Sequence, residues 1–148
     1  MDKKFDVVIV GTGAAGLYAA LNFPESVNIL LVSKRELQLS NSSLAQGGVA
    51  CVLDTVHDSY KLHITDTLIA GKYKNTLSAV EKLVTEGPSD VLKIKDLGVD
   101  FDLNEDGTMC KTLEAGHSRN RIVHHNDSTG MAIVDGLIAK VTQLKNVP

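Results

Sequence analysis

The stretch FDVVIVGTGAAG, residues 5–16, decides the fold of this chain. An apolar run rich in β-branched residues leads directly into the pattern Gly11-x-Gly13-x-x-Gly16, and a helix-forming segment follows. In such strand–turn–helix units the first glycine permits a tight turn, the second lets a pyrophosphate approach the backbone, and the third lets the helix pack closely on the strand. The helix N-terminus then offers free N–H groups and partial positive charge to an anion. The segment therefore predicts a dinucleotide site rather than a plain glycine-rich turn.

The residues that follow extend this start into a β-α-β unit. The unbroken apolar character of residues 5–10 predicts a first strand buried on both faces. Residues 14–23 are predicted to form a helix that Pro24 ends. Residues 27–32, VNILLV, are predicted to form a second strand, parallel to the first by the right-handed crossover rule. The predicted fold class is therefore α/β, with a Rossmann-like nucleotide-binding sheet.

The end of the second strand departs from the pattern of nicotinamide-binding proteins. An acidic residue commonly stands there and accepts a hydrogen bond from the ribose 2′-hydroxyl, whereas this chain has Ser33, Lys34 and Arg35. Ser33 is expected to hydrogen-bond the ribose and Lys34 to reach the adenine or a phosphate. Arg35 is interpreted as part of a solvated loop. The missing acid disfavours NAD as the sole cofactor.

Composition excludes several classes of function. The chain has 148 residues, 43% of them hydrophobic and 22% charged, which suits one globular domain. A net charge of −3 gives no general electrostatic reason to bind nucleic acid or an anionic membrane. Cys51 and Cys110 lie far apart without a CxxC partner, so we expect reduced, partly buried thiols and no metal site. The first strand is no signal peptide, and no apolar segment is long enough to span a bilayer, so a cytoplasmic location is expected.

The second half of the chain is predicted to be mainly helical with a small strand pair. Gly87-Pro88 is expected to separate two helices, and the turn at 104–107 is expected to be solvated because it lacks the glutamate that would complete a calcium loop. Arg121 is expected to pair with a carboxylate, and His124-His125 is expected not to bind metal. The predicted elements are helices at 59–70, 76–85 and 89–97, a short edge strand at 99–102, and a helix at 129–144 capped by residues 127–129.

A polar loop at residues 39–48, LSNSSLAQGG, has two interpretations. Its serines, amides and paired glycines offer hydrogen-bond donors without bulk, so the loop suits contact with a flat ring system. Composition alone equally supports an ordinary surface loop.

Five segments together resemble one flavoprotein family. GTGAAGLYAAL, SK, NSSLAQGGVA, HITDTLIAG and LEAGHSRNRI occur in this order and are similar to the L-aspartate oxidases, a branch of the succinate dehydrogenase and fumarate reductase flavoproteins. The AQGG loop and the GHSRNRI segment are much more specific than the glycine pattern. The resemblance implies FAD as cofactor. The cofactor-binding residues that it implies are Gly11, Thr12, Gly13, Ala14, Ala15, Gly16, Ser33, Lys34, Asn41, Ser42, Ser43, Leu44, Ala45, Gln46, Gly47 and Gly48.

Asn41 bears on how the flavin would be held. Succinate dehydrogenases and many fumarate reductases carry a histidine five residues before the glutamine of AQGG, and this histidine bonds covalently to the flavin. Here Asn41 stands five residues before Gln46, and an amide cannot form that bond. The resemblance therefore implies non-covalent FAD and argues against a respiratory subunit.

Glu114 is the residue that the resemblance connects to the substrate. In the similar enzymes a glutamate just before the glycine–histidine pair faces the ammonium group of the substrate, which distinguishes an amino diacid from succinate. The resemblance assigns His117 and Ser118 to contacts with the flavin or to shaping the pocket. The family usually has two glycines after this glutamate, whereas this chain has Ala115, so the local geometry departs from the pattern.

The implied reaction is oxidation of L-aspartate to iminoaspartate on the quinolinate branch of NAD biosynthesis, with oxygen or fumarate as electron acceptor. Residues 1–148 are expected to be the N-terminal part of an FAD-binding domain, with the capping domain and C-terminal segments lying downstream and no turnover by this part alone. The incomplete sheet is expected to leave an edge available for self-association. The alternatives are an FAD-dependent dicarboxylate dehydrogenase or fumarate reductase, and a non-catalytic nucleotide-binding fragment.

Overall fold

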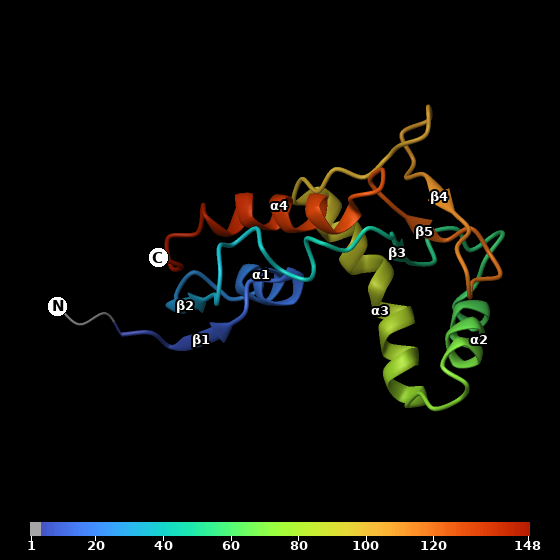
Figure 1. Cartoon of the computed structure of the whole chain (residues 1–148), viewed down its shortest axis with the longest axis horizontal. Coiled ribbons are helices and arrows are strands. Elements are labelled where there is room, and N and C mark those ends of the chain that lie inside the picture. The colour runs from blue at the N-terminus through green and yellow to red at the C-terminus, as the bar shows by residue number, and fades with distance from the viewer. Residues whose placement is uncertain (1–3) are drawn as a thin grey trace.

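The computed structural model describes residues 4–148 and begins with the expected β-α-β unit (Figure 1). Strand β1, Val7–Val10, pairs in parallel with β2, Ile29–Val32, and Val7 lies opposite Ile29. Helix α1, Ala14–Leu21, connects the two strands. The prediction of two parallel strands joined by a helix is thus confirmed, with each element two residues shorter than expected.

Helix α4, Thr129–Val141, packs along α1 and closes the first hydrophobic core. Ser128 occupies its N-cap position, as expected, but its side chain makes no capping hydrogen bond. Apolar side chains from α1, β2 and α4 meet between the helices and the sheet. The fully buried members of this core are Leu17, Ala20, Ile29, Val134, Leu137 and Val141.

The segment that follows α4 returns to the outer edge of β2. The backbone N–H of Ile29 donates to the carbonyl of Asn146 at 2.9 Å. The Asn146 amide nitrogen donates to the carbonyl of Val27 at 2.7 Å. Three chain segments therefore lie side by side at this end of the sheet, in the order Asn146, β2, β1.

The far face of the β1–β2 sheet is uncovered in residues 4–148. Val8 is 57% exposed, Val10 83% and Val32 40%, whereas Ile29 on β2 is fully buried. The expectation that the first strand is buried on both faces is therefore wrong for this chain. Within the described residues, α1 and α4 form one layer of helices, and no second layer lies against the opposite face.

A second, small sheet was predicted in the wrong place. Strands β3, Val49–Ala50, β4, Lys111–Thr112, and β5, Ile122–Val123, form an antiparallel sheet in the order β3-β5-β4. The expected edge strand at 99–102 is not a strand, although the turn after it forms, with the Gly107 N–H donating to the Asn104 carbonyl at 2.9 Å. Each strand has only two residues, which is too short to show the alternation that identifies strands in a sequence.

Helices α2 and α3 form a hairpin beneath this sheet. Helix α2, Tyr60–Ala70, begins at Ser59, whose side chain accepts a hydrogen bond from the Leu62 N–H, as the predicted helix start requires. Helix α3 is a single helix, Leu77–Asp96, with Pro88 inside it, so the prediction of two helices here is wrong.

The helix continues through Pro88 because local and tertiary factors both favour it. A residue before proline is disfavoured in the helical conformation partly because its Cβ meets the proline ring, and Gly87 has no Cβ. Val84, Pro88 and Val91 lie on one buried face of α3. Burial of this face offsets the lost backbone hydrogen bond.

A second core joins α3 to the small sheet. Its buried residues are Cys51, Val91, Val99, Phe101, Met109 and Val123. Ile94 and Ile133 pack against both this core and the first one, so the two parts of the molecule share side chains. Cys51 is 1% exposed, and Cys110 is partly exposed; both are free thiols, as predicted.

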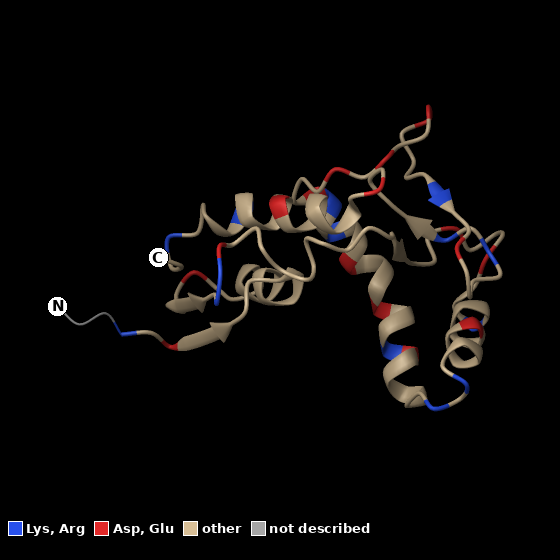
Figure 2. Cartoon of the chain, in the orientation of Figure 1, with Lys and Arg blue, Asp and Glu red and all other residues tan. Residues whose placement is uncertain are grey.

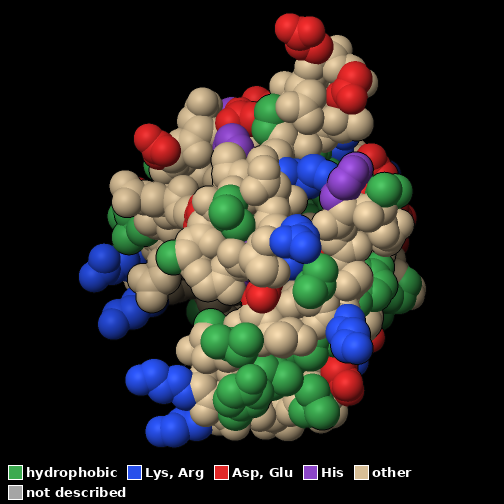
Figure 3. Space-filling model, turned by 90° about the vertical axis from the view of Figure 1, so that its right-hand side faces the viewer, with side chains coloured by type: hydrophobic (Ala, Val, Ile, Leu, Met, Phe, Trp, Pro, Cys, Tyr) green, Lys and Arg blue, Asp and Glu red, His purple; other side chains and the backbone are tan. Residues whose placement is uncertain are grey.

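The surface carries both signs of charge and one apolar area. Lys and Arg are interspersed with Asp and Glu along much of the ribbon, whereas α1 and the loop at 39–48 carry no charged residue (Figure 2). Apolar side chains gather on the lower end of the α2–α3 hairpin (Figure 3), where the large exposed ones include Ile69, Tyr73, Leu77 and Leu83. In residues 4–148, no helix has the length and apolar character needed to cross a membrane.

Candidate functional site

The glycine turn between β1 and α1 has the geometry that its sequence predicts. Gly11 has φ +112°, a region that favours glycine, and its N–H donates to the Val32 carbonyl at 2.8 Å. A Cβ on Gly16 would lie 2.0 Å from the Gly11 carbonyl oxygen. The turn therefore folds back tightly onto the first turn of α1, and only glycine fits at position 16.

The first turn of α1 presents backbone donors to the outside. Gly13 is its N-cap, in an extended conformation and without a side-chain cap. The N–H of Ala14 donates to the hydroxyl of Ser42 at 3.1 Å. In the described part of the chain, the N–H groups of Ala15 and Gly16 have no acceptor from the protein. This turn fits a phosphate, which supplies such acceptors.

Thr12 and Ser33 meet beside this turn. The buried Thr12 hydroxyl donates to the Ser33 hydroxyl oxygen at 2.9 Å, and the backbone N–H of Arg35 donates to the same oxygen at 3.3 Å. Lys34, which lies between Ser33 and Arg35 in the sequence, is exposed. The structure thus brings the predicted phosphate and adenosine residues to one end of the sheet.

The loop at 39–48 is fixed against both α1 and α4. Ser42 contacts α1 as described, and the carbonyl of Ala45 accepts from the Gly130 N–H at 3.0 Å. A Cβ on Gly130 would lie 2.0 Å from the Ser42 carbonyl oxygen. Ser43 is buried and donates to the Gln38 carbonyl at 2.6 Å, so its hydroxyl stabilises the loop from inside.

The rest of this loop makes one further contact and includes exposed side chains. A Cβ on Gly48 would lie 2.4 Å from the Ile122 side chain, so the end of the loop packs directly on β5. Asn41, Leu44 and Gln46 are exposed. The loop therefore holds a fixed backbone while these side chains remain available for contact.

Glu114 lies beside the end of this loop. Its Oε2 is 3.7 Å from the position that a Cβ would take on Gly47. Both segments line one shallow hollow of about 480 Å³. The lining residues are Gln46, Gly47, Gly48, Asp102, Thr112, Glu114, His124, Asn126 and Asp127. The structure thus brings together Glu114 and the AQGG segment, residues 45–48, which lie far apart in the sequence.

His124 and Asp102 also line this hollow, and sequence reasoning did not place them there. Nδ1 of His124 lies 2.9 Å from a carboxylate oxygen of Asp102. The hydrogen bond from the Asn126 N–H, followed by the positive field of His124, lowers the pKa of Asp102. Three carboxylates, those of Asp102, Glu114 and Asp127, give the hollow an acidic character. Among residues 4–148, no three His, Cys, Asp or Glu side chains gather as metal ligands.

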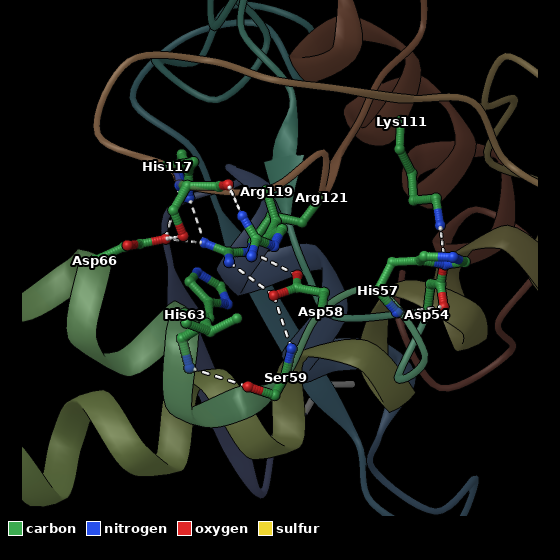
Figure 4. A network of polar contacts seen from close by, with 12 residues as sticks. Asp54, His57, Asp58, Ser59, His63, Asp66, Lys111, His117, Arg119 and Arg121 are labelled. Carbon is green, nitrogen blue, oxygen red and sulfur yellow. Dashed lines mark hydrogen bonds and ion pairs between the residues drawn. The ribbon is translucent and has the colours of Figure 1, made fainter.

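A buried ion-pair network is centred on Arg121 (Figure 4). The Arg121 side chain is 1% exposed; Nε and Nη2 donate to the two carboxylate oxygens of Asp58 at 2.7 and 2.8 Å. Its Nη1 donates to Asp66 at 2.5 Å and lies 3.1 Å from Nδ1 of His117. The expectation that Arg121 pairs with a carboxylate is confirmed, and it pairs with two.

Opposite charges in this network hold its groups ionised. Burial is the largest single influence on Asp58 and Asp66 and raises the pKa of both. The hydrogen bonds from Arg121, those from Ser59 or Ser118 and the charge of Arg121 together outweigh burial and lower both pKa values. The hydrogen bonds that Arg121 donates raise its own pKa. His63 packs against His117, with ring centroids 5.5 Å apart, and its burial followed by the nearby Arg121 charge lowers its pKa to about 4.

His117 and Ser118 belong to this network rather than to the hollow that Glu114 lines. The N–H and hydroxyl of Ser118 both donate to Asp66, at 2.9 and 2.8 Å. Neither residue lines the hollow. Within this chain the structure therefore separates the predicted catalytic trio into Glu114 at the hollow and a His117–Ser118 pair anchored on α2.

Comparison with known proteins identifies the class of this fold. A family model described as an FAD binding domain matches residues 6–148. Among solved structures, a variant of E. coli quinol fumarate reductase superposes with a TM-score of 0.92 at 27% identity, over 97% of this chain and 25% of that chain. Mycobacterium smegmatis Sdh1 superposes with a TM-score of 0.88 at 28% identity, over 97% of this chain and 26% of that chain. The chain belongs to this family of FAD-binding domains, as the sequence predicted.

Curated relatives define the branch within the family. The L-aspartate oxidase of Clostridium perfringens is 44% identical over 147 residues, 99% of this chain and 33% of that protein. The L-aspartate oxidase of Nostoc sp. is 42% identical over 145 residues, 98% of this chain and 25% of that protein. The chain is therefore a homologue of L-aspartate oxidases and spans a quarter to a third of the length of these relatives.

Proposed function

We propose that this chain binds FAD non-covalently and contributes the FAD-binding part of an L-aspartate oxidase. The family match establishes the FAD-binding class, and three local features fit the cofactor. These are the glycine turn, the unpaired N–H groups of Ala15 and Gly16, and the Thr12–Ser33 contact at the same end of the sheet. When bound, FAD supplies the redox chemistry.

The residues of this chain would hold the cofactor by distinct contacts. Residues 11–16 would bind the pyrophosphate at the N-terminus of α1, with Ser33 and Lys34 near the adenosine. The loop at 39–48 would lie along the flavin, because its exposed side chains and fixed backbone suit contact with a planar ring. Asn41 is exposed and carries an amide, which supports non-covalent binding.

The absorbance spectrum of the purified chain, taken before and after acid precipitation, tests this proposal. We expect added FAD to be retained on gel filtration and then released into the acid supernatant. Flavin that stays with the acid pellet would overturn the non-covalent proposal. Failure to retain FAD would overturn the proposal that this chain holds the cofactor unaided. Gly16→Ala is the matched variant, because its Cβ would meet the Gly11 carbonyl and it should not retain FAD.

L-aspartate is the substrate that the acidic hollow supports best. This proposal rests on the position of Glu114, whose carboxylate lies against Gly47 in the loop at residues 39–48, called the flavin loop below. A carboxylate beside the flavin would pair with the ammonium group of an amino diacid and would repel the carboxylate of a diacid that lacks an amine. Glu114 would thereby orient the Cα–H of aspartate, and oxygen or fumarate is the proposed electron acceptor. A cytoplasmic location, predicted from the sequence, is part of the same proposal.

The likeness to fumarate reductases favours a second candidate, a flavoprotein acting on a dicarboxylate without an amine. The two candidates differ in the role of Glu114. A chimera in which this chain replaces the 147 matched residues of the Clostridium perfringens enzyme provides a complete protein for the test.

Glu114→Gln is the first predicted change. In the chimera we expect the kcat/KM for L-aspartate to fall about 10- to 100-fold, because a charged hydrogen bond contributes roughly 1.5–3 kcal/mol. The inhibition constant of succinate, measured in the same assay, should change little or improve. The exposed Glu105→Gln is the matched control and should leave both values unchanged. Equal losses for aspartate and succinate would favour the second candidate.

A further inference from the structure

We propose that Arg121, Asp58 and Asp66 form a buried clamp that positions Glu114, and thereby set the selectivity for an amino diacid. The selectivity rests on the proposed function above, whereas the clamp itself rests only on the contacts of this chain. Arg121 lies immediately before β5, Asp58 lies just before α2, and Asp66 lies on α2. None of the three lines the hollow beside the flavin loop, so their effect on Glu114 is one of position and not of contact.

The guanidinium of Arg121 is held on three sides. Asp58 accepts two parallel hydrogen bonds, a geometry that fixes the plane of the guanidinium. Asp66 accepts from Nη1 on a second side, and Nδ1 of His117 lies against the same nitrogen on a third. The side chains of Asp58 and Asp66 are 4% and 11% exposed, so water competes little for these contacts.

The contact with Arg121 makes Nδ1 of His117 a hydrogen-bond acceptor. A guanidinium donates hydrogen bonds and accepts none, so Nδ1 of His117 must accept through its lone pair. The His117 ring is held between Arg121 and the buried ring of His63. The clamp thus extends from the core to His117, the last residue of the turn at 114–117.

The turn from Glu114 to His117 connects the clamp to the hollow that Glu114 lines. The backbone N–H of His117 donates to the Glu114 carbonyl at 3.2 Å, and Gly116 has φ +87°. On the other side of His117, Ser118 is tied to Asp66 by two hydrogen bonds. No described residue donates a hydrogen bond to the Glu114 carboxylate, so its position follows from the turn that carries it.

Asp66→Asn tests the clamp with the least damage to the fold. It keeps the size of the side chain and leaves the pair between Arg121 and Asp58 intact, whereas loss of Asp58 would strand a buried charge. The exposed Asp96→Asn on α3 makes the same chemical change away from the clamp. Circular dichroism confirms that each variant folds before the measurements below.

Hydrogen exchange on this chain gives a readout that needs neither cofactor nor activity. In Asp66→Asn we expect the amides of residues 113–121 to exchange about tenfold faster, which corresponds to roughly 1.4 kcal/mol of local stability. Peptides from α4 should keep their rates, and Asp96→Asn should match the parent chain throughout. Unchanged exchange at 113–121 in Asp66→Asn would overturn the clamp.

Selectivity in the chimera gives the second readout. We expect Asp66→Asn to lower the kcat/KM for L-aspartate about tenfold while the inhibition constant of succinate stays within about twofold. A general loss of structure would weaken both ligands together and so would not give this split. Faster amide exchange at residues 113–121 with unchanged selectivity for aspartate over succinate would overturn the proposal that the clamp positions Glu114. If the parent chimera does not oxidise aspartate, the proposed function fails, and the exchange result still decides whether the clamp orders the turn.

Discussion

His63 is a buried titratable side chain beside the Arg121 network. It is 6% exposed, and its Nδ1 has no hydrogen-bond partner in the described residues. Burial first, then the charge of Arg121, lowers its pKa to about 4, against the opposing effect of Asp58 and Asp66. The ring is therefore neutral at physiological pH and behaves as an apolar spacer beside the clamp.

This pKa predicts how stability depends on pH. Between pH 6.5 and about 4 the unfolded chain binds a proton at His63 that the folded chain does not, so the free energy of unfolding falls as the pH is lowered through this window. The contribution is up to about 3 kcal/mol. Urea unfolding at several pH values should show a smaller decline in His63→Leu and in His63→Gln than in the parent. An unchanged pH dependence in both variants would contradict the assignment.

Single residues also show how far a sequence predicts a site. The chemistry of Arg121 predicted a carboxylate partner, because a buried guanidinium needs one. The identity of the partners was not predictable, since Asp58 and Asp66 lie 63 and 55 residues earlier and only the fold brings them there. His124 was overlooked for the same reason, because its place at the hollow depends on the small sheet.

At the scale of elements, the loop at 39–48 and helix α4 behave as one unit. The loop carbonyls of Ser42 and Ala45 lie where a side chain at Gly130 would stand. The N-terminus of α4 thus holds the loop against α1, and Ser42 of the loop accepts a hydrogen bond from the Ala14 N–H of the glycine turn. Two segments of the proposed cofactor site therefore depend on one glycine in a distant helix.

Gly130→Ala is predicted to separate these segments. Its Cβ would lie 2.0 Å from the Ser42 carbonyl oxygen and 2.7 Å from that of Ala45, so the loop must move. We expect a loss of stability of roughly 1–3 kcal/mol by overpacking and an FAD affinity at least about tenfold weaker. Urea unfolding and flavin fluorescence titration measure the two effects. Met131→Ala, on the same helix at a half-exposed position, is the control and should retain FAD. Normal FAD binding by Gly130→Ala would show that the loop does not need this contact.

The elements that were predicted correctly are those with a strong local pattern. The apolar run of β1, the apolar residues of α2 and the stripe of α4 identify their elements without the rest of the fold. Helix α3 was divided in two because Gly87-Pro88 normally ends a helix, and the apolar contacts that keep it whole come from other segments. The two-residue strands have no pattern of their own, since their pairing is set by the loops between them.

At the scale of the whole molecule, the order of the main parts followed from the sequence, but the surface did not. The β-α-β start and the helical second half were predicted, and the resemblance placed both in an FAD-binding domain. The open face of the β1–β2 sheet was not predicted from the strand itself, because an apolar strand indicates burial without indicating what covers it. Val8, Val10 and Val32 form this face.

We predict that this face makes the isolated chain self-associate. Exposed apolar strands at an open sheet edge favour pairing between copies. Val8→Thr with Val10→Thr keeps the shape of the side chains and removes apolar surface, so the apparent mass in light scattering should fall toward 15.9 kDa. Leu83→Ser, at an apolar position of α3 that is 69% exposed, is the control and should leave the mass unchanged. A parent chain that is already monomeric at high concentration would contradict the prediction.

The two cysteines give the molecule a built-in place for a spectroscopic label. Cys51 is sealed in the second core, and its burial raises its pKa to about 12, so it stays unreactive toward thiol reagents. Cys110 is partly exposed and lies immediately before β4, four residues ahead of Glu114. A fluorophore attached there reports on the turn at residues 114–117 from the residue just before β4. Ligand entry and clamp motion thereby become visible in the natural sequence, without introducing or removing a cysteine.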